Sequence, residues 1–387
     1  MSPRFFNQKA LVVGAGAMGG GIAQVLTESG WEVLLYDTQD EALEKGLGRV
    51  HATWDKLVEK GKISAEQRET YSARLKAAYV LREAADVSLA IEAIYENLEA
   101  KRSVFTTLDD VVRTDCILAT NTSSLSVSSI AAGVKQPERV IGLHFFNPAP
   151  LMPLVELVPG LATAPEVVEA CVHAVASWGK VGVIAQDTPG FLVNRIARPF
   201  YGESLHLVEE RMADMATVDW ALTELGGFRM GPFALMDLIG HDVNYVVTET
   251  VWKQFYYDPR FRPSLSQKRL LEAGWLGRKS GRGFYDYRNG ATLPEPTRDE
   301  ALGRRIVDRV VAMLINEAAD AVYRGIGTES DVETAMLKGV NYPKGLIAWG
   351  REWGWTAVRD QIEALHRRTG DPRYRVCPWI HDQIAAQ

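Results

Sequence analysis

The sequence has 387 residues, 47% of them hydrophobic and 24% charged, which predicts two or three globular domains and excludes a disordered or fibrous chain. Its 43 Lys and Arg against 49 Asp and Glu give a net charge of −6, which argues against a nucleic-acid-binding protein that depends on bulk charge. Three widely separated cysteines exclude a disulfide framework and indicate a reducing compartment. Residues 1–6 show no targeting signal, so we expect a cytoplasmic protein.

The first 190 residues alternate short apolar runs with helical patterns. Such an order predicts a parallel sheet with helices on both faces. A longer helical excursion is expected at residues 41–80, interrupted near Gly61. The predicted strands are residues 10–13, 32–36, 87–91, 116–120, 140–144, 154–157 and 181–185.

From residue 187 onward strand-like runs disappear and amphipathic helical patterns such as residues 191–212 take over. Residues 289–297, with two prolines, are typical of a linker. We therefore expect a Rossmann-type α/β domain followed by two all-α helical domains. The expected boundaries are 1–186, 187–295 and 296–387.

The helical part contains a weak internal repeat, in which six positions match at a fixed spacing of 114 residues. A small helical unit with an apolar face often buries it against a copy of itself. We expect the second unit to act as an internal partner for the first, although further oligomerisation is possible. The matches are Arg195 with Arg309, Glu203 with Glu317, Val218 with Val332, Ala221 with Ala335, Gly231 with Gly345 and Gly240 with Gly354.

Gly14, Gly16 and Gly19 form a GxGxxG motif between the first predicted strand and a helix. Gly14 permits a tight turn, Gly16 lets the backbone approach a pyrophosphate, and Gly19 allows close helix–strand packing. Asp37 ends the next predicted strand and can accept both hydroxyls of an adenosine ribose. The alternative is a glycine-rich turn without a nucleotide.

Asp37 also favours one cofactor over others. A carboxylate there repels a 2′-phosphate, and residues 38–40 include no arginine that could bind one, so NAD is favoured over NADP. FAD is a less favoured ligand because no second flavin motif is evident. No metal is expected, since the seven histidines lack ligand spacing.

His144 closes one predicted strand, and Glu156 lies in the next, within an apolar run. A buried carboxylate needs a partner, and the connection between the two strands is short enough to bring them together. Such a pair fixes the imidazole's tautomer and suits it to accept a proton from an alcohol. The alternative for His144 alone is an ordinary core histidine.

Asn121, Ser123 and Ser124 follow a predicted strand and could hold a substrate oxygen without adding charge. Taken by themselves, they are better explained as caps of the next helix. A serine hydrolase is excluded because the sequence has no GxSxG elbow.

Taken together, these motifs closely resemble the L-3-hydroxyacyl-CoA dehydrogenase family over residues 8–287. The second helical unit resembles tandem-domain members of the family, of the bacterial 3-hydroxybutyryl-CoA dehydrogenase type, whose extra copy is catalytically degenerate. The matching segments are residues 14–19, 91–101, 121–125, 142–148, 187–195, 230–233 and 277–285.

The resemblance implies roles for individual residues. His144 corresponds to the general base and Glu156 to its orienting partner, while Ser123 and Asn194 hold the substrate. Contacts to the cofactor are implied for Asp37, Glu96, Lys101, Ser123, Asn147 and Lys279.

The excursion resembles the family's coenzyme-A arm, with Lys60 and Thr53 at positions that contact CoA. Residues 45–80 hold eight Lys and Arg against four Asp and Glu, a local charge of +4 that suits CoA phosphates. An ordinary solvated helical face is the alternative.

The second helical unit departs from the family pattern. Asp308 stands where the first has Asn194, and the segments around residues 187–191 and 279–281 do not recur, so one active site per chain is expected.

The resemblance implies NAD-dependent, reversible oxidation of L-3-hydroxyacyl-CoA to 3-oxoacyl-CoA, as in fatty acid β-oxidation. Two alternatives remain open: a dehydrogenase of a free hydroxy acid such as gulonate or carnitine, and an NAD-binding protein without catalytic activity.

Overall fold

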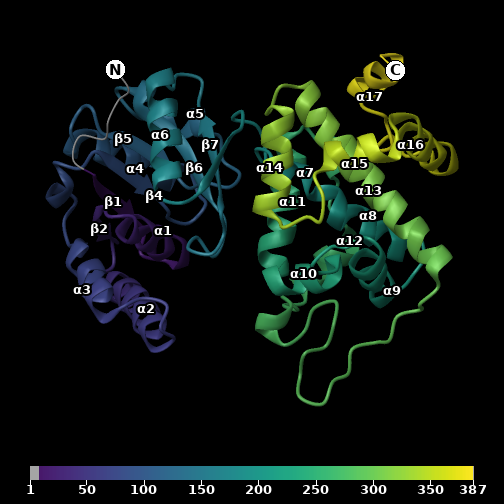
Figure 1. Ribbon diagram of the computed structural model, residues 1–387, viewed down its shortest axis with the longest axis horizontal. Helices are drawn as coiled ribbons and strands as arrows, with labels where there is room; N and C mark the ends of the chain where they lie inside the picture. Colours follow the sequence, from purple (N-terminus) through teal and green to yellow (C-terminus); the bar gives the residue numbers. More distant parts are fainter. Residues whose placement is uncertain (1–7, 387) are drawn as a thin grey trace. The chain divides into compact units, whose positions relative to one another are not determined.

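The computed structural model describes residues 8–386, which form two compact units that divide between Thr188 and Pro189 (Figure 1). The predicted boundary at 186/187 lies beside this division, whereas the predicted boundary at 295/296 falls inside the second unit. The N-terminal segment that shows no targeting signal lies outside the described residues. Across residues 8–386, no helix combines the length and apolar character needed to span a bilayer.

An eight-stranded sheet forms the centre of the first unit, in the order β3-β2-β1-β4-β5-β6-β7-β8. Neighbouring strands are parallel except β6 and β7, which pair antiparallel. This is the doubly wound arrangement in which the chain crosses over between β3 and β4, beside β1. The strands are β1 (Lys9–Val13), β2 (Glu32–Tyr36), β3 (Leu75–Ala78), β4 (Leu89–Glu92), β5 (Ile117–Thr120), β6 (Val140–Phe145), β7 (Leu154–Pro159) and β8 (Val181–Ile184).

Helices cover both faces of this sheet because alternate strand residues point to opposite sides and both sets are apolar. Side chains of α1, α2 and α6 share one buried core with half of the strand residues, and α4 contacts α5 away from that core. The helices are α1 (Ala17–Glu28), α2 (Asp40–Glu59), α3 (Ala65–Arg74), α4 (Leu98–Val111), α5 (Val127–Ala131) and α6 (Pro165–Ser177), with 3₁₀ turns η1 (Leu81–Ala84) and η2 (Pro137–Arg139).

Two features of the sheet differ from the sequence prediction. The excursion expected at 41–80 is helical only to Arg74, because residues 75–78 form the edge strand β3 beside β2. Lys76 and two alanines give that segment no β signature, so only the pairing partner reveals it. Strand β7 runs antiparallel because the connection from β6 is too short for the crossover that a parallel strand requires.

In the first unit, the predicted helix interruption near Gly61 is confirmed. The second unit is helical, as predicted. Its elements are α7 (Val193–Ile196), α8 (Arg198–Glu209), α9 (Met215–Trp220), the π-turn η3 (Ala221–Leu225), α10 (Pro232–Ile239), α11 (His241–Gln254), η4 (Pro259–Phe261), α12 (Leu265–Glu272), η5 (Arg278–Ser280), α13 (Glu300–Tyr323), α14 (Glu329–Gly339), α15 (Leu346–Trp353), α16 (Trp355–Thr369) and α17 (Pro378–Ala385).

Helix α13 lies at the centre of the second unit. Residues 309–321 are buried on every side of the helix, which marks a core helix and not a surface one. It contacts α8 and α9 from the first part of the unit and α14, α15, α16 and α17 from the second. The two helical parts therefore share one core, and residues 291–299 join them without helix or strand.

Candidate active site

The turn after β1 has the close approaches that the glycine motif predicts. Gly14 has φ +102°, and a Cβ there would lie 2.6 Å from the carbonyl oxygen of Ala93. A Cβ at Gly19 would lie 1.7 Å from the carbonyl oxygen of Gly14, so the helix packs directly on the turn. At Gly16 a Cβ would meet nothing within 4 Å, and this residue begins α1 without a side-chain cap. An open helix N-terminus of this kind suits a pyrophosphate.

Asp37 is held beside this turn at the end of β2. Its Oδ2 accepts a hydrogen bond from the Ala15 N–H at 2.8 Å, and its Oδ1 accepts one from the Gln39 N–H at 3.1 Å. The carboxylate is therefore fixed next to the glycine turn, where the ribose of a dinucleotide would lie.

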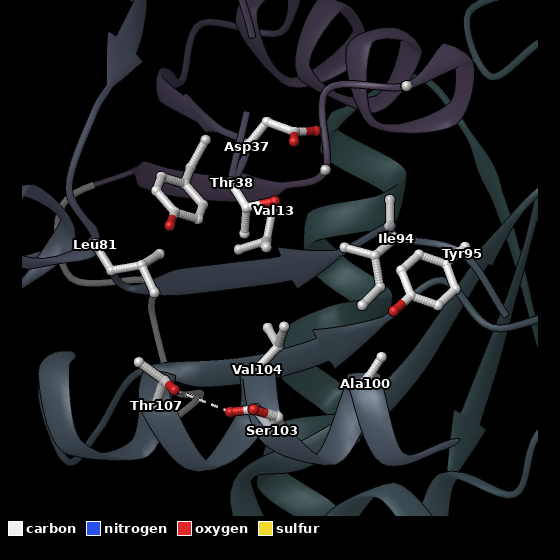
Figure 2. Close-up of a pocket in the computed structure, with 14 residues that line it drawn as sticks. Val13, Asp37, Thr38, Leu81, Ile94, Tyr95, Ala100, Ser103, Val104 and Thr107 are labelled. Atoms are coloured by element: carbon white, nitrogen blue, oxygen red, sulfur yellow. Dashed lines mark hydrogen bonds between the residues drawn. The ribbon is translucent and has the colours of Figure 1, made fainter. Parts of the chain in front are cut away.

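A pocket of about 640 Å³ opens at this end of the sheet (Figure 2). Its volume is typical of small-molecule sites, and its wall is mostly apolar with a polar rim at Asp37 and Thr38. The residues present fit the adenosine half of NAD. The lining consists of Val13, Gly14, Gly16, Tyr36, Asp37, Thr38, Leu81, Ala93, Ile94, Tyr95, Ala100, Ser103, Val104 and Thr107.

Lys101 lies under the neighbouring loops and not on the surface. Its side chain is 1% exposed, and its ammonium lies 2.7 Å from Glu92 Oε1 and 3.3 Å from Glu96 Oε2. The other oxygen of Glu92 accepts a hydrogen bond from the Thr120 hydroxyl at 2.7 Å. Lys101 thus ties the ends of β4 and β5 to α4. Glu92 was not among the predicted site residues, although a carboxylate at the end of an apolar run was a usable signal.

Glu96 organises the loop that follows β5. Its Oε1 accepts hydrogen bonds from the Thr122 hydroxyl at 2.5 Å and from the N–H groups of Ser123 and Ser124 at 3.0 and 3.1 Å. Burial alone would raise the pKa of Glu96, but Lys101 and these donors lower it below its ordinary value.

The helix cap that the sequence allowed as an alternative role for Asn121, Ser123 and Ser124 is made instead by Ser126, which starts α5.

His144 and Glu156 face each other across the antiparallel β6–β7 pair, as the register requires. The distance from His144 Nδ1 to Glu156 Oε2 is 2.6 Å, and the two residues are 6% and 0% exposed. The Phe146 ring lies 4.5 Å from the imidazole, centroid to centroid. With Glu156 accepting the Nδ1–H, the neutral ring carries its lone pair on Nε2.

Asn147, a predicted cofactor contact, follows β6 at an exposed position and is joined to Pro148 by a cis peptide bond.

Of the predicted CoA-arm residues, Thr53 lies on α2 and Lys60 is the residue that caps its C-terminal end. Thr53 and Lys60 are both exposed, and their spacing of seven residues is two helical turns, which places them on one face. Arg49, one turn before Thr53, donates from Nη2 to the Ala15 carbonyl at 2.6 Å and so joins the arm to the glycine turn. Arg49 was not among the predicted site residues.

The remaining predicted site residues belong to the second unit. Asn194 lies on α7, and Lys279 lies on η5 with its ammonium 2.6 Å from Asp242 Oδ2. The loop that carries Lys279 is anchored by Asp237, a buried residue that accepts hydrogen bonds from the Phe284 and Tyr285 N–H groups, both at 2.9 Å.

Asp237 also pairs with His241, whose Nε2 lies 2.9 Å from its Oδ1, and both residues are fully buried. Neither was predicted to be functional. The available sequence signal was Asp237 within the apolar run of residues 233–239, with His241 four residues later.

Comparison of this chain with known proteins identifies its family. The family model described as "3-hydroxyacyl-CoA dehydrogenase, NAD binding domain" matches residues 9–188, and the model described as "3-hydroxyacyl-CoA dehydrogenase, C-terminal domain" matches residues 190–287 and 306–387. The 3-hydroxyadipyl-CoA dehydrogenase of Escherichia coli K12 is 39% identical over 97% of this chain and 97% of its own length. A probable 3-hydroxybutyryl-CoA dehydrogenase of Bacillus subtilis is 40% identical over 72% of this chain and 97% of its own.

Among solved structures, the crystal structure of 3-hydroxybutyryl-CoA dehydrogenase from Escherichia coli K12 has a TM-score of 0.94 at 37% identity and covers 98% of both chains. Fold and site together define an oxidoreductase with a Rossmann-type NAD-binding domain. The chain belongs to the 3-hydroxyacyl-CoA dehydrogenase family. The predicted family, the α/β-then-helical fold and the NAD cofactor are confirmed.

Proposed function

We propose that this protein oxidises L-3-hydroxyacyl-CoA to 3-oxoacyl-CoA reversibly, with NAD as the hydride acceptor. The observation that carries the proposal is the hydrogen bond of 2.6 Å between His144 Nδ1 and Glu156 Oε2 at one edge of an NAD-binding domain. His144 Nε2 takes the proton of the C3 hydroxyl while the hydride leaves C3. Glu156 stabilises the imidazolium that forms, and protonated His144 returns the proton in the reverse reaction.

The other site residues bind and orient. Ser123, on the loop fixed by Glu96, and Asn194, on α7, hold the substrate oxygen. Asp37, Glu96, Asn147 and Lys279 contact the cofactor. Lys101 serves it through Glu92 and Glu96, because the buried ammonium is already paired with both carboxylates. Thr53, on the exposed face of α2, and Lys60, at its C-terminal end, bind the CoA moiety.

The test is His144→Gln, which removes the base and keeps a side chain of similar size. A positioned general base contributes about 10²- to 10⁴-fold, so kcat falls by at least that range while NAD binding by fluorescence titration is retained. Glu156→Gln lowers kcat in the same direction.

His173→Gln is the matched control, since His173 also neighbours a glutamate, Glu169 at 3.8 Å, but on the surface of α6. Near-normal turnover by His144→Gln would overturn the assignment.

The CoA thioester is favoured over a free hydroxy acid because the helical arm has a net charge of +4 and exposes Lys60. The curated relatives carry the names 3-hydroxybutyryl-CoA and 3-hydroxyadipyl-CoA dehydrogenase, so the acyl chain is short and its far end is either a methyl group or a carboxylate. Equal kcat/KM for 3-hydroxybutyryl-CoA and free 3-hydroxybutyrate would favour the hydroxy-acid alternative.

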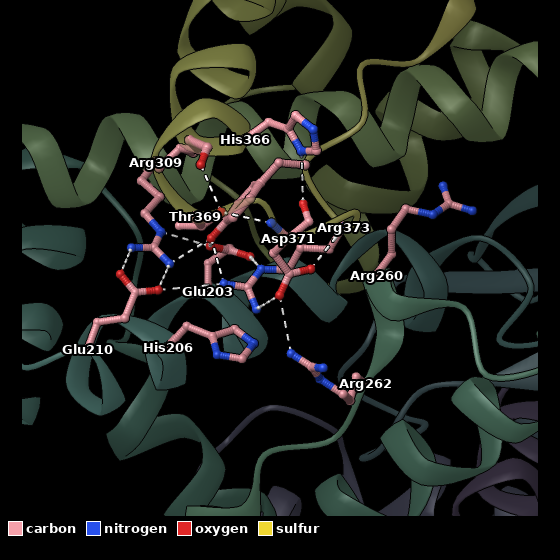
Figure 3. A network of polar contacts seen from close by, with 12 residues as sticks. Glu203, His206, Glu210, Arg260, Arg262, Arg309, His366, Thr369, Asp371 and Arg373 are labelled. Atoms are coloured by element: carbon pink, nitrogen blue, oxygen red, sulfur yellow. Dashed lines mark hydrogen bonds and ion pairs between the residues drawn. The ribbon is translucent and has the colours of Figure 1, made fainter.

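We also propose that the two helical parts arose by duplication and pack as an internal pseudo-dimer. Arg195 pairs with Glu317 at 2.7 Å, and Arg309 pairs with Glu203 at 2.8 Å (Figure 3 shows the second pair). Arg309 and Glu317 are the positions 114 residues after Arg195 and Glu203, so the two contacts exchange equivalent partners. Reciprocal contacts of this kind characterise a two-fold interface.

A second reciprocal pair supports the same proposal. The segments 258–262 (DPRFR) and 371–375 (DPRYR) differ at one residue and lie 113 residues apart, a match that the sequence analysis overlooked. Arg262 contacts Asp371 at 3.2 Å, and Arg375 contacts Asp258 at 2.6 Å. With this surface occupied internally, the chain does not need a second subunit to cover it.

A cytoplasmic location is supported by the thiols. Cys116, Cys171 and Cys377 are all free and buried, and burial raises the pKa of Cys116 and Cys171 to about 12. Thiols of this kind do not form disulfides, which agrees with a reducing compartment.

A further inference from the structure

Arg198, at the start of α8, is a buried arginine without a carboxylate. Five arginines are buried among the described residues, and the other four have carboxylate partners. Those partners are Asp109 for Arg139, Glu317 and Asp320 for Arg195, Glu203 and Glu210 for Arg309, and Glu203 for Arg373. Arg198 is 6% exposed and differs from this set.

The groups around Arg198 are neutral. Its Nε donates to the Asn194 carbonyl at 2.7 Å, its Nη1 donates to the Thr248 hydroxyl at 2.9 Å, and its guanidinium lies 5.0 Å from the centre of the Tyr201 ring. Burial lowers the pKa of Arg198, because no acid offsets the loss of water. A buried cation without a counterion is unfavourable, and an anionic ligand would offset part of that penalty.

A second polar group near this part of α8 lacks a partner, on Tyr342, whose ring lies 5.9 Å from that of Phe200, centroid to centroid. The Tyr342 hydroxyl is buried and makes no hydrogen bond in the described structure. Burial raises the pKa of Tyr342 well above its ordinary value, with a further contribution from Tyr201. A hydroxyl donor without an acceptor and a guanidinium without an anionic partner match the two oxygens of a carboxylate.

The position of Arg198 relates it to the substrate. It follows Asn194 by four residues, about one helical turn of 5.4 Å across the junction of α7 and α8, and its Nε donates to the Asn194 carbonyl. Asn194 is the residue that the proposed function assigns to the acyl group near C3. A span of one turn beyond it is comparable to three further carbon atoms of an acyl chain.

We propose that Arg198, with Thr248 and Tyr342, forms a subsite for a carboxylate at the far end of the acyl chain. This inference rests on the proposed function and names its substrate class: 3-hydroxyacyl-CoA thioesters of dicarboxylic acids, with the free carboxylate three carbons beyond the hydroxyl carbon. Tyr342 comes from the second helical part, which thereby contributes a substrate contact although it has no site of its own.

Two substrates that differ only at the chain end test the subsite. 3-Hydroxyadipyl-CoA ends in a carboxylate where 3-hydroxyhexanoyl-CoA ends in a methyl group. We expect the wild-type protein to prefer the first in kcat/KM, and Arg198→Met to lower that preference by roughly 10- to 100-fold, the range expected for one charge-assisted hydrogen-bond pair. Arg198→Lys, which keeps the charge and loses the fork, gives an intermediate ratio.

Arg304→Met, at an exposed arginine of α13, is the control and leaves the ratio unchanged. A purely structural role for Arg198 would lower both kcat/KM values equally and keep their ratio. That result would overturn the subsite. A wild-type protein with no preference for the carboxylated substrate would also overturn it, and this outcome does not depend on whether the variant folds.

Binding provides a readout that is independent of turnover. Adipyl-CoA and hexanoyl-CoA lack the 3-hydroxyl and cannot react, so calorimetry can measure their Kd values on the complete chain. We expect Arg198→Met to weaken adipyl-CoA selectively, and equal weakening of both ligands contradicts the subsite. Failure of the wild-type protein to oxidise either 3-hydroxy substrate would instead overturn the proposed function.

Discussion

The two parts of the helical unit, residues 190–287 and 306–387, match one family model and keep the same scaffold. Asp219 accepts a hydrogen bond from the Phe233 N–H at 2.9 Å and caps α10. Glu333, 114 residues later, accepts one from the Ile347 N–H at 2.6 Å and caps α15. The reciprocal arginine–glutamate pairs are likewise present on both sides.

The buried pair of Asp237 and His241 is present only in the first part. At 114 residues after Asp237 and His241 stand Arg351 and Trp355. Asp237 is fully buried and holds the loop of Lys279, whereas Arg351 is 55% exposed and pairs with Glu329. The comparison indicates that residues needed to bury the shared core are found in both parts, whereas the buried acid–histidine pair that anchors the loop of Lys279 is found in one.

Removal of residues 296–387 should have the largest effect. This truncation deletes α13 and leaves the apolar surface of α8, together with the buried Arg195, without cover. We expect dimerisation or aggregation, because an exposed apolar face of that size seeks a partner. Light scattering measures the outcome, and a soluble, stable monomer would contradict the internal pseudo-dimer.

The reciprocal ion pairs should contribute similarly to stability. Arg195→Met leaves Glu317 and Asp320 buried with fewer partners, and Arg309→Met does the same to Glu203, so each should cost about 3–5 kcal/mol in the free energy of unfolding. Urea denaturation measures both values. A cost for one variant and none for the other would show that the two contacts are not equivalent.

Asp237 and Arg351 provide the sharpest contrast between the parts. Asp237→Ala removes the acceptor of His241 and of the Phe284 and Tyr285 N–H groups and should cost about 3 kcal/mol, because it leaves buried donors unsatisfied. Arg351→Ala, at the matching position, should change stability by less than about 1 kcal/mol, as expected for an exposed pair. The first variant should also raise the KM for NAD. Equal effects of the two variants would remove the distinction.

The smallest expected effect is a pH dependence that both caps share. Burial raises the pKa of Asp219 to about 6 and also raises that of Glu333. A carboxyl whose pKa is higher in the folded chain binds more protons there, so stability falls as pH rises from about 4 to 6. Each unit of difference corresponds to about 1.4 kcal/mol.

Asp219→Asn should flatten this dependence, and Glu333→Gln should flatten it in the same direction. Denaturation curves between pH 4 and 7 check the sign. A wild-type stability that rises through this window, with the slope unchanged in both variants, would contradict the assignment.

Much of the first unit could be predicted from sequence because its signals are local. The strand ending before Gly14, the helix after it and the acid at Asp37 follow from periodicity and turn chemistry within one segment. The edge strand β3 could not, because Lys76 and its alanines prefer no strand until β2 offers a partner. The catalytic, cofactor-binding and substrate-binding roles assigned to individual residues all stay predictions.

The sequence alone determined the class of fold, the cofactor and the pairing of His144 with Glu156, since each depends on residues a short connection apart. Only the tertiary structure revealed the contacts between distant segments: Glu96 gathering the Ser123 loop, Asp237 anchoring the loop of Lys279, and Arg198 buried without an acid. The reason is physical. Whether a charged side chain is paired or isolated depends on which elements pack around it, and packing brings together residues that no local spacing connects.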